Sequence, residues 1–207
     1  MTRFWFPILA AAAVASATAC ANNATPSLVT PATSATPTVT LRAPGTASVP
    51  ALTVTSNAFA NGTTMPTAEA VTGCAGGSNV SPDLTWTGAP SNTKSFVITE
   101  FDPDAPTGVG FWHWLLFNIP STVTTIAGGA GTSPPSGTAG LNDYGSLAYG
   151  GPCPPVGDGP HHYHFTISAL DTVLTGMPPT TTTGAYLTFN MRGHIIAQGT
   201  YLGLFSL

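Results

Sequence analysis

The sequence predicts a mainly antiparallel β domain with one helix near its C-terminus. Short runs rich in apolar, β-branched and aromatic residues recur from Leu52 to Phe205, as is typical of strands. Glycine and proline, 23 and 20 of the 207 residues, fall between these runs and favour turns. One late segment, Tyr186 to Ala197, has the length of a sizeable helix, although its Thr, Asn and Gly residues are weak helix formers.

The expected strands differ in how apolar they are. Leu52–Thr55 and Leu84–Thr87 alternate apolar and polar residues, as half-buried strands do. A last strand is expected around Thr200 to Phe205. Three more apolar runs are expected to be central strands: Ser95–Phe101, Trp112–Ile119 and His164–Leu170.

Residues 1–19 have the pattern of an export signal. Arg3 supplies a short positive region, and Phe4–Ala15 is an apolar run too short to span a bilayer. The small residues Ala17–Ala19 precede Cys20, which fits two outcomes. Cleavage after residue 19 would give an ordinary secreted protein. Recognition as a lipobox would instead make Cys20 a lipid acceptor, and that lipid would be the only membrane attachment. Either outcome places the protein in the bacterial cell envelope, periplasmic or secreted.

Residues 20–50 have the composition of a tether. Their Thr, Ala, Pro, Ser and Val residues follow no hydrophobic period, so little apolar surface is available to compensate the entropy of ordering. We therefore expect a disordered Thr/Ala/Pro-rich tether over 20–50 and one domain over 51–207.

The charge pattern excludes one class of partner. Charged residues make up only 6% of the chain, and the net charge is −4. Once Arg3 is removed with the signal, only Arg42, Lys94 and Arg192 are cationic. Nucleic acid binding requires clustered cations, so no nucleic acid partner is expected.

The cysteines allow two interpretations. If Cys20 is acylated, Cys74 and Cys153 remain as an even pair in an oxidising compartment, where disulfides persist. We expect a disulfide between them. The alternative is a pair of buried free thiols.

A first polar motif, Asp102-Pro-Asp104-Ala-Pro106, directly follows an expected strand. Because His113 begins the next strand, Asp102 and His113 are expected at one edge of the sheet. A carboxylate beside an imidazole fixes its tautomer and favours its protonated form. The alternative is that Asp102 and Asp104 only cap the turn with their side-chain oxygens.

A second loop, Gly150–Pro160, leads into a strand at His161. Alternation places His161 and Tyr163 on one face of that strand, and His162 and His164 on the other. An imidazole and a phenol hydroxyl on one face can hold a small oxyanion between them. In the alternative, Tyr163 is a core residue and His161 binds a loop carbonyl.

Several ordered motifs together resemble the phosphatidylethanolamine-binding protein family, in particular its bacterial branch of kinase-inhibitor-like proteins. The resemblance covers about Leu52 to Leu207. The motifs that carry it are Asn79–Trp86, Asp102–Pro106, His113-Trp114, Asn118–Pro120, Asn142–Gly145, Gly151–Pro155, His161–Tyr163, and Gly193–Gln198 followed by Tyr201 and Gly203.

The resemblance implies two packed antiparallel sheets, a C-terminal helix, and a small pocket for phosphate or phospholipid head-group-like ligands. It also implies a cis peptide bond before Pro106. His162 stands where the family usually has arginine, which removes a fixed cation from the pocket region. The positions that match the family's pocket are Asp102, Asp104, His113, Pro155, His161 and Tyr163.

We therefore expect a binding protein for a small anion, without enzymatic activity, cofactor or metal. A protein-interaction or inhibitor module with an unidentified protein partner is an alternative, because the resembled family includes inhibitors of kinases and of a serine carboxypeptidase. A metal-dependent hydrolase, with a metal held by Asp102, Asp104, His113 and His161, is another. The sequence contains neither an H-E-x-x-H nor a G-x-S-x-G motif, so no known hydrolase motif supports this alternative.

Overall fold

The computed structural model describes residues 49–207. The expected signal peptide (1–19), the Cys20 lipid acceptor and nearly all of the expected tether (20–50) lie outside the described residues. No helix of the described part is long and apolar enough to cross a bilayer.

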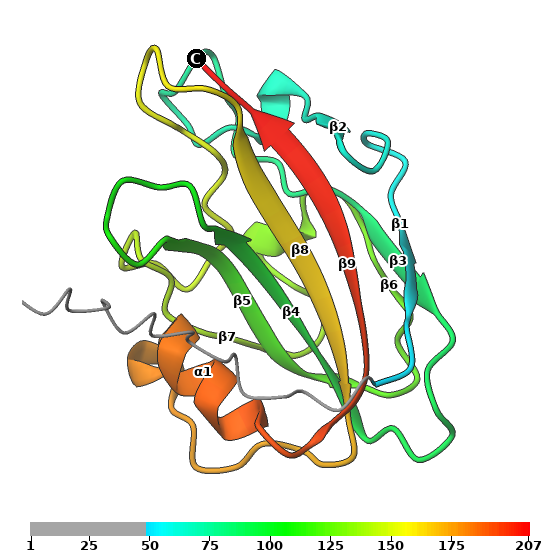
Figure 1. The fold of residues 1–207 in the computed structure, drawn as a ribbon. Coiled ribbons are helices and arrows are strands. Elements are labelled where there is room, and N and C mark those ends of the chain that lie inside the picture. The colour runs from blue at the N-terminus through cyan, green and yellow to red at the C-terminus, as the bar shows by residue number, and fades with distance from the viewer. Residues whose placement is uncertain (1–48) are drawn as a thin grey trace, which may run out of the picture. The chain divides into compact units, whose positions relative to one another are not determined.

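The described residues form two sheets and one α-helix (Figure 1). Pairing is antiparallel except between β2 and β9. The small sheet has the order β1 (Thr53–Thr55), β3 (Leu84–Thr87), β6 (Thr125–Ile126). The large sheet has the order β2 (Thr63–Thr64), β9 (Ile195–Phe205), β8 (His161–Leu170), β4 (Ser95–Asp102), β5 (Phe111–Pro120), β7 (Thr138–Ala139).

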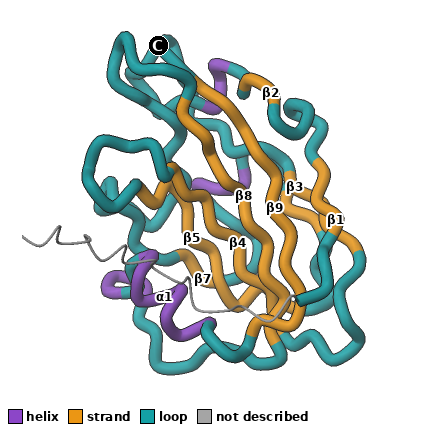
Figure 2. The backbone as a smooth tube through the Cα atoms, in the orientation of Figure 1, coloured by secondary structure: helices purple, strands orange, loops and turns teal. Residues whose placement is uncertain are grey.

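Helix α1 (Gly184–Met191) covers part of the outer face of the large sheet (Figure 2). Three short 3₁₀ turns complete the fold: Thr67–Glu69, Ala130–Thr132 and Pro179–Thr181.

Both faces of β4 are buried, which explains its apolar sequence. Phe96 and Ile98 join the core between the two sheets, together with Trp86 of β3. Val97 points the other way and packs in a second core with Leu187 of α1. Both cores consist of residues between Leu52 and Phe205, so the domain contains its own hydrophobic interior.

The predicted architecture is confirmed, with one error near the C-terminus. A helix was expected over Tyr186–Ala197, but α1 ends at Met191 and β9 already begins at Ile195. Gly193, with φ +85°, supplies the left-handed conformation that ends the helix. The β-branched residues that follow then pair with the end of β8.

The predicted disulfide between Cys74 and Cys153 is present, with the two Cα atoms 5.8 Å apart. The alternative of two free thiols is therefore wrong for this structure. The bond joins the segment after the first 3₁₀ turn to the loop that precedes β8. It closes a separation of 79 residues and so fixes a wall of the site described below.

Candidate functional site

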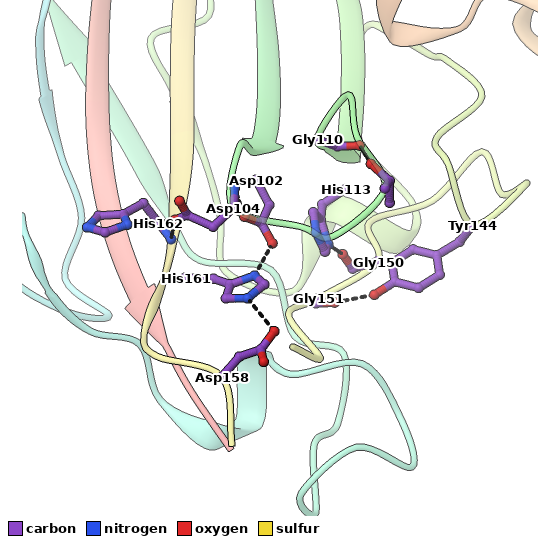
Figure 3. Close-up of polar contacts among 11 residues, drawn as sticks. Asp102, Asp104, Gly110, His113, Tyr144, Gly150, Gly151, Asp158, His161 and His162 are labelled. Carbon is purple, nitrogen blue, oxygen red and sulfur yellow. Dashed lines mark hydrogen bonds and ion pairs between the residues drawn. The ribbon is translucent and has the colours of Figure 1, made fainter. Parts of the chain in front are cut away.

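The two sequence motifs meet at one end of the large sheet. Asp102 is the last residue of β4, and it pairs with Phe111 at the start of β5. On the other side of β4, Phe101 pairs with His164 of β8. This register brings Asp102, His113 and the start of β8 together, as expected from the sequence (Figure 3).

Asp102 has two roles at once. Its Oδ1 accepts a hydrogen bond from the backbone N–H of Asp104 at 2.9 Å, which caps the turn. Its Oδ2 lies 2.7 Å from Nδ1 of His161. The turn cap expected of Asp102 is therefore present. The imidazole beside its carboxylate is that of His161 and not, as expected, that of His113, whose Nδ1 binds Gly150 instead.

His161 lies between two carboxylates. Its Nδ1 binds Asp102, and its Nε2 lies 3.6 Å from Oδ2 of Asp158 (Figure 3). Burial disfavours the charged ring, but the hydrogen bond and the charge of Asp102 outweigh this effect and raise the pKa of His161. The protonated, cationic form of His161 is therefore favoured relative to a free imidazole. The 3.6 Å separation is too long for a good hydrogen bond, so Nε2 is only loosely held.

His113 has the opposite electrostatic character. Burial, which penalises the imidazolium, lowers the pKa of His113. Its Nδ1 lies 2.8 Å from the carbonyl oxygen of Gly150, and because a carbonyl only accepts, Nδ1 carries the proton. Neutral His113 therefore presents Nε2 as an acceptor.

Two tyrosines complete the polar surface. Tyr163 is fully buried, and its hydroxyl has no protein partner among the described residues. The Tyr144 hydroxyl donates to the carbonyl of Gly151 at 3.0 Å. Burial raises the pKa of Tyr144 to about 12, and burial also raises the pKa of Tyr163. Both side chains are therefore neutral hydroxyls near physiological pH.

These groups surround a pocket of about 200 Å³. Five of the six sequence-predicted positions line it, and Asp104 does not. Of the other lining residues, Pro106 and Cys153 were singled out for a cis bond and a disulfide, and Ala105, Tyr144 and Pro154 fall in the recognised motifs. Only Thr107 and Phe111 carried no signal in the sequence. The lining residues are Asp102, Ala105, Pro106, Thr107, Phe111, His113, Tyr144, Cys153, Pro154, Pro155, His161 and Tyr163.

Asp104 instead binds His162 outside the pocket. Its Oδ2 accepts from the backbone N–H of His162 at 2.8 Å and lies 2.6 Å from Nδ1 of the same residue. The His162 side-chain hydrogen bond lowers the pKa of Asp104. His162 and Asp104 are about half exposed, so the histidine that stands in place of arginine is occupied with this surface pair.

The resemblance implied a cis peptide bond before Pro106, but this bond is trans. No cis peptide bond occurs among residues 49–207. A tertiary X–Pro amide still favours trans by about 0.5–1 kcal/mol, and the turn is accommodated without the rarer isomer.

Two buried glutamates, Glu100 and Glu69, lie close enough to interact electrostatically, and Glu100 also interacts with Asp102 of the pocket. Glu100, two residues before Asp102 on the same face of β4, is fully buried, and neither of its carboxyl oxygens has a partner among the described residues. Burial, together with the charges of Glu69 and Asp102, raises the pKa of Glu100. Burial and the charge of Asp83 raise the pKa of Glu69 to about 8. Neither glutamate was singled out as a site residue from the sequence.

Within residues 49–207, no group of three or more His, Cys, Asp or Glu residues is arranged to hold a metal ion. The four side chains considered for a hydrolytic metal are engaged elsewhere. Asp104 binds His162, His161 binds Asp102, and His113 binds a backbone carbonyl.

Comparison with known proteins gives consistent matches over the domain. Residues 55–206 match the family described as phosphatidylethanolamine-binding protein. The chain is 50% identical over 129 residues to the UPF0098 protein YbcL of Escherichia coli, covering 59% of this chain and 70% of that protein. It is 40% identical over 157 residues to a UPF0098 protein of Aquifex aeolicus, covering 73% and 86% of the two chains.

Solved structures give the same result. The crystal structure of Escherichia coli YbcL, described as a new member of the mammalian PEBP family, superposes with a TM-score of 0.71 at 40% identity, covering 75% of this chain and 98% of that one. A PEBP homologue from Chlamydia trachomatis superposes with a TM-score of 0.65 at 34% identity, covering 76% and 98%.

The first prediction concerns the stability contributed by Glu69. Its folded pKa is raised above its usual value, so its contribution is fully present below pH 4.5, declines as the pH rises above 4.5, and is lost by about pH 8. By linkage the loss is at most about 5 kcal/mol. Glu69→Gln cannot ionise, so its free energy of unfolding should fall less between pH 5 and 9. Denaturant unfolding across that range, with Glu100→Gln as a parallel variant, measures this. Identical slopes in wild type and Glu69→Gln would contradict it.

Proposed function

Because the chain belongs to the phosphatidylethanolamine-binding protein family, we propose that it is a non-enzymatic binding protein for a small anion, either phosphate or the phosphorylated head group of a phospholipid. The observation that carries the proposal is the composition of the pocket. A cationic imidazole, a second imidazole and an unpaired buried hydroxyl all line one volume of about 200 Å³. A volume of this size suits a head group and excludes a long acyl chain.

His161 supplies the attraction for the anion. Its Nδ1 proton is committed to Asp102, which holds the ring in place. Its Nε2 proton faces Asp158 across 3.6 Å, and the Asp158 side chain is 45% exposed. We infer that an incoming anion displaces the Asp158 carboxylate from Nε2, as one negatively charged acceptor replaces another. Binding is then weak, because the ligand competes with a carboxylate that is always nearby.

The other two groups recognise oxygen atoms rather than charge. The Tyr163 hydroxyl lies near the Asp102 carboxylate but makes no hydrogen bond of good geometry within the described residues, so it can donate to an anion oxygen. Neutral His113 accepts at Nε2 and suits a protonated phosphate oxygen. Beside the Asp102 carboxylate, which pairs with His161, the pocket therefore offers one cation, one neutral donor and one acceptor, a set that matches a partly protonated phosphate better than a fully ionised one.

The second prediction is the pH dependence of anion binding, measured with sulfate because its charge is constant in this range. His161 has a raised pKa, so it is charged at low pH and becomes neutral as the pH rises through that value. Sulfate affinity should fall accordingly between about pH 6 and 9. His161→Gln should remove this dependence and weaken binding at pH 6 by about tenfold, as expected for the loss of a charge-assisted hydrogen bond.

Calorimetric titration, with and without a chelator, checks this result. His194→Gln is the matched control, because His194 also pairs with an aspartate, at 2.9 Å, but lies outside the pocket. Equal sulfate binding by wild type and His161→Gln would contradict the assignment. Binding abolished by the chelator would instead favour a metal site.

The third prediction is that Asp158→Asn strengthens anion binding. Removing a carboxylate near the bound anion relieves a repulsion of about 1 kcal/mol in water, or roughly fivefold in affinity. Because Asp158 also helps to raise the pKa of His161, the comparison belongs at pH 6, where the imidazole stays protonated.

Asp171→Asn is the control, since it changes the net charge equally and removes an aspartate from a comparable exposed histidine pair. The displacement step would be refuted if Asp158→Asn bound sulfate no more tightly than the control.

A further inference from the structure

A second concave surface, which we call the outer groove, lies on the outer face of the large sheet beside α1 (Figure 1). Strands β4, β8 and β9 form its floor, and Thr188 and Met191 of α1 form one wall. Its β4 residues Thr99 and Phe101 alternate with Asp102 of the anion pocket, so the two sites lie on opposite faces of the sheet. The volume of the outer groove is about 480 Å³, within the range typical of small-molecule sites.

One end of the outer groove is aromatic. Trp112, Phe101 and His164 are neighbours in register on β5, β4 and β8. The ring centroids of Phe101 and Trp112 lie 4.4 Å apart, and both side chains are only partly buried. On its other side the indole packs against Gly184 of α1, where a Cβ would fall 2.3 Å from the ring. The two rings therefore form an accessible apolar platform that the helix holds in position.

Further along the same strands the floor is polar but uncharged. Thr99 lies beside Thr166 in the register of β4 and β8, and Ser168 lies beside Gln198 in the register of β8 and β9. Nε2 of Gln198 donates to the Ser168 hydroxyl at 2.8 Å, which orients the amide and leaves its Oε1 as an acceptor. Hydroxyls both donate and accept, so this end offers neutral hydrogen-bonding groups at fixed positions.

The composition of the outer groove restricts its ligand. Its lining residues include no aspartate, glutamate, lysine or arginine, and His164 is the only titratable side chain among them. An ion therefore finds no opposite charge there. An acyl chain is disfavoured because it would cover the hydroxyls and the amide without replacing their hydrogen bonds to water.

An extended peptide is also disfavoured. Peptides that bind sheets usually do so by adding a strand to an open edge. Strands β4 and β8 are paired on both sides, so their backbone groups are already used. Recognition in the outer groove must therefore come from side chains, which suits a compact, uncharged ligand.

We propose that the outer groove binds a neutral saccharide, with a sugar ring stacked on Phe101 and Trp112. A sugar ring combines polarised C–H groups, which the negative faces of aromatic rings attract, with hydroxyls that need both donors and acceptors. The outer groove presents these two features side by side, because Thr99 and Gln198 lie next to the aromatic platform. All its hydrogen bonds to the ligand are neutral, so the expected Kd is weak, about 1 mM.

NMR titration of the ¹⁵N-labelled chain from Ala21 onward with cellobiose, maltose and N,N′-diacetylchitobiose tests the proposal. That chain has three tryptophans, Trp86, Trp112 and Trp114, and Trp112 alone among them lines the outer groove. Its indole N–H resonance, assigned with Trp112→Phe, should shift saturably with at least one of the three sugars. The indole resonances of Trp86 and Trp114, which are buried in the core between the sheets, should move far less.

The double variant Thr99→Val/Gln198→Met removes a hydroxyl and an amide with little change in shape. It should weaken binding of that sugar by about tenfold or more, the effect expected for two lost neutral hydrogen bonds. Thr99→Val alone, a conservative change within a strand, should weaken binding by about fivefold and serves if the double variant does not fold. Thr85→Val is the matched control, because Thr85 also carries its hydroxyl on a strand but lies in the small sheet, beside Thr125. It should bind the sugar like the wild type.

The absence of a Trp112 shift with all three sugars would overturn the proposal, as would equal sugar affinity in the wild type and the folded variants. Sulfate separates this site from the anion pocket. Saturating sulfate should not displace the sugar, and the double variant should keep the wild-type sulfate affinity, because the two sites share no lining residue. Competition between sulfate and the sugar would place the sugar in the anion pocket and overturn the outer groove as its site.

Discussion

The hydrogen bond between Asp102 and His161 joins the end of β4 to the start of β8, and the arrangement of the pocket depends on it. The same carboxylate caps the turn after β4 with its other oxygen. The Asp102 side chain therefore both caps the turn after β4 and orients the imidazole of His161. Asp102 is 2% exposed, so water competes little for these bonds, which makes them stronger than they would be on the surface.

The two histidines of the pocket differ because their partners differ. His161 faces carboxylates, which favour its cationic form, whereas His113 faces a carbonyl in a buried position, which favours its neutral form. One residue type thus supplies both a charge and a neutral acceptor within a single pocket. The buried Glu100 and Glu69 remain protonated over the lower part of the pH range and add no charge there. Burying these carboxyls is less favourable than burying apolar side chains would be, and such unfavourable buried groups are common near functional sites.

Local patterns predicted much of the fold. Strands such as β3 and β4 are bounded by turn residues and buried as their apolar content indicated. The end of α1 was misjudged because Gly193 and the β-branched pair after it outweigh the apparent length of the helical segment. Alternation along β8 correctly separated His161 and Tyr163 from His162 and His164.

The candidate site was predicted less completely, because it depends on distances between loops. Asp104 was expected in the pocket, but it turns to His162, a contact that no spacing rule gives. Asp158, three residues before His161, carried no motif, yet it faces Nε2. The burial of Glu100 could not be predicted from sequence patterns, because acidic residues are rarely found at core positions. Its burial follows only from the register of β4 against both neighbouring strands.

In this pocket His161 is the fixed cation and His113 its neutral partner. Nitrogen NMR of ¹⁵N-labelled histidine, followed against pH and assigned with His161→Gln and His113→Gln, reports both protonation and tautomer. We expect both nitrogens of His161 to be protonated at pH 6.5. At the same pH we expect His113 to carry one proton, on Nδ1. A neutral His161, or a charged His113, at pH 6.5 would contradict this assignment.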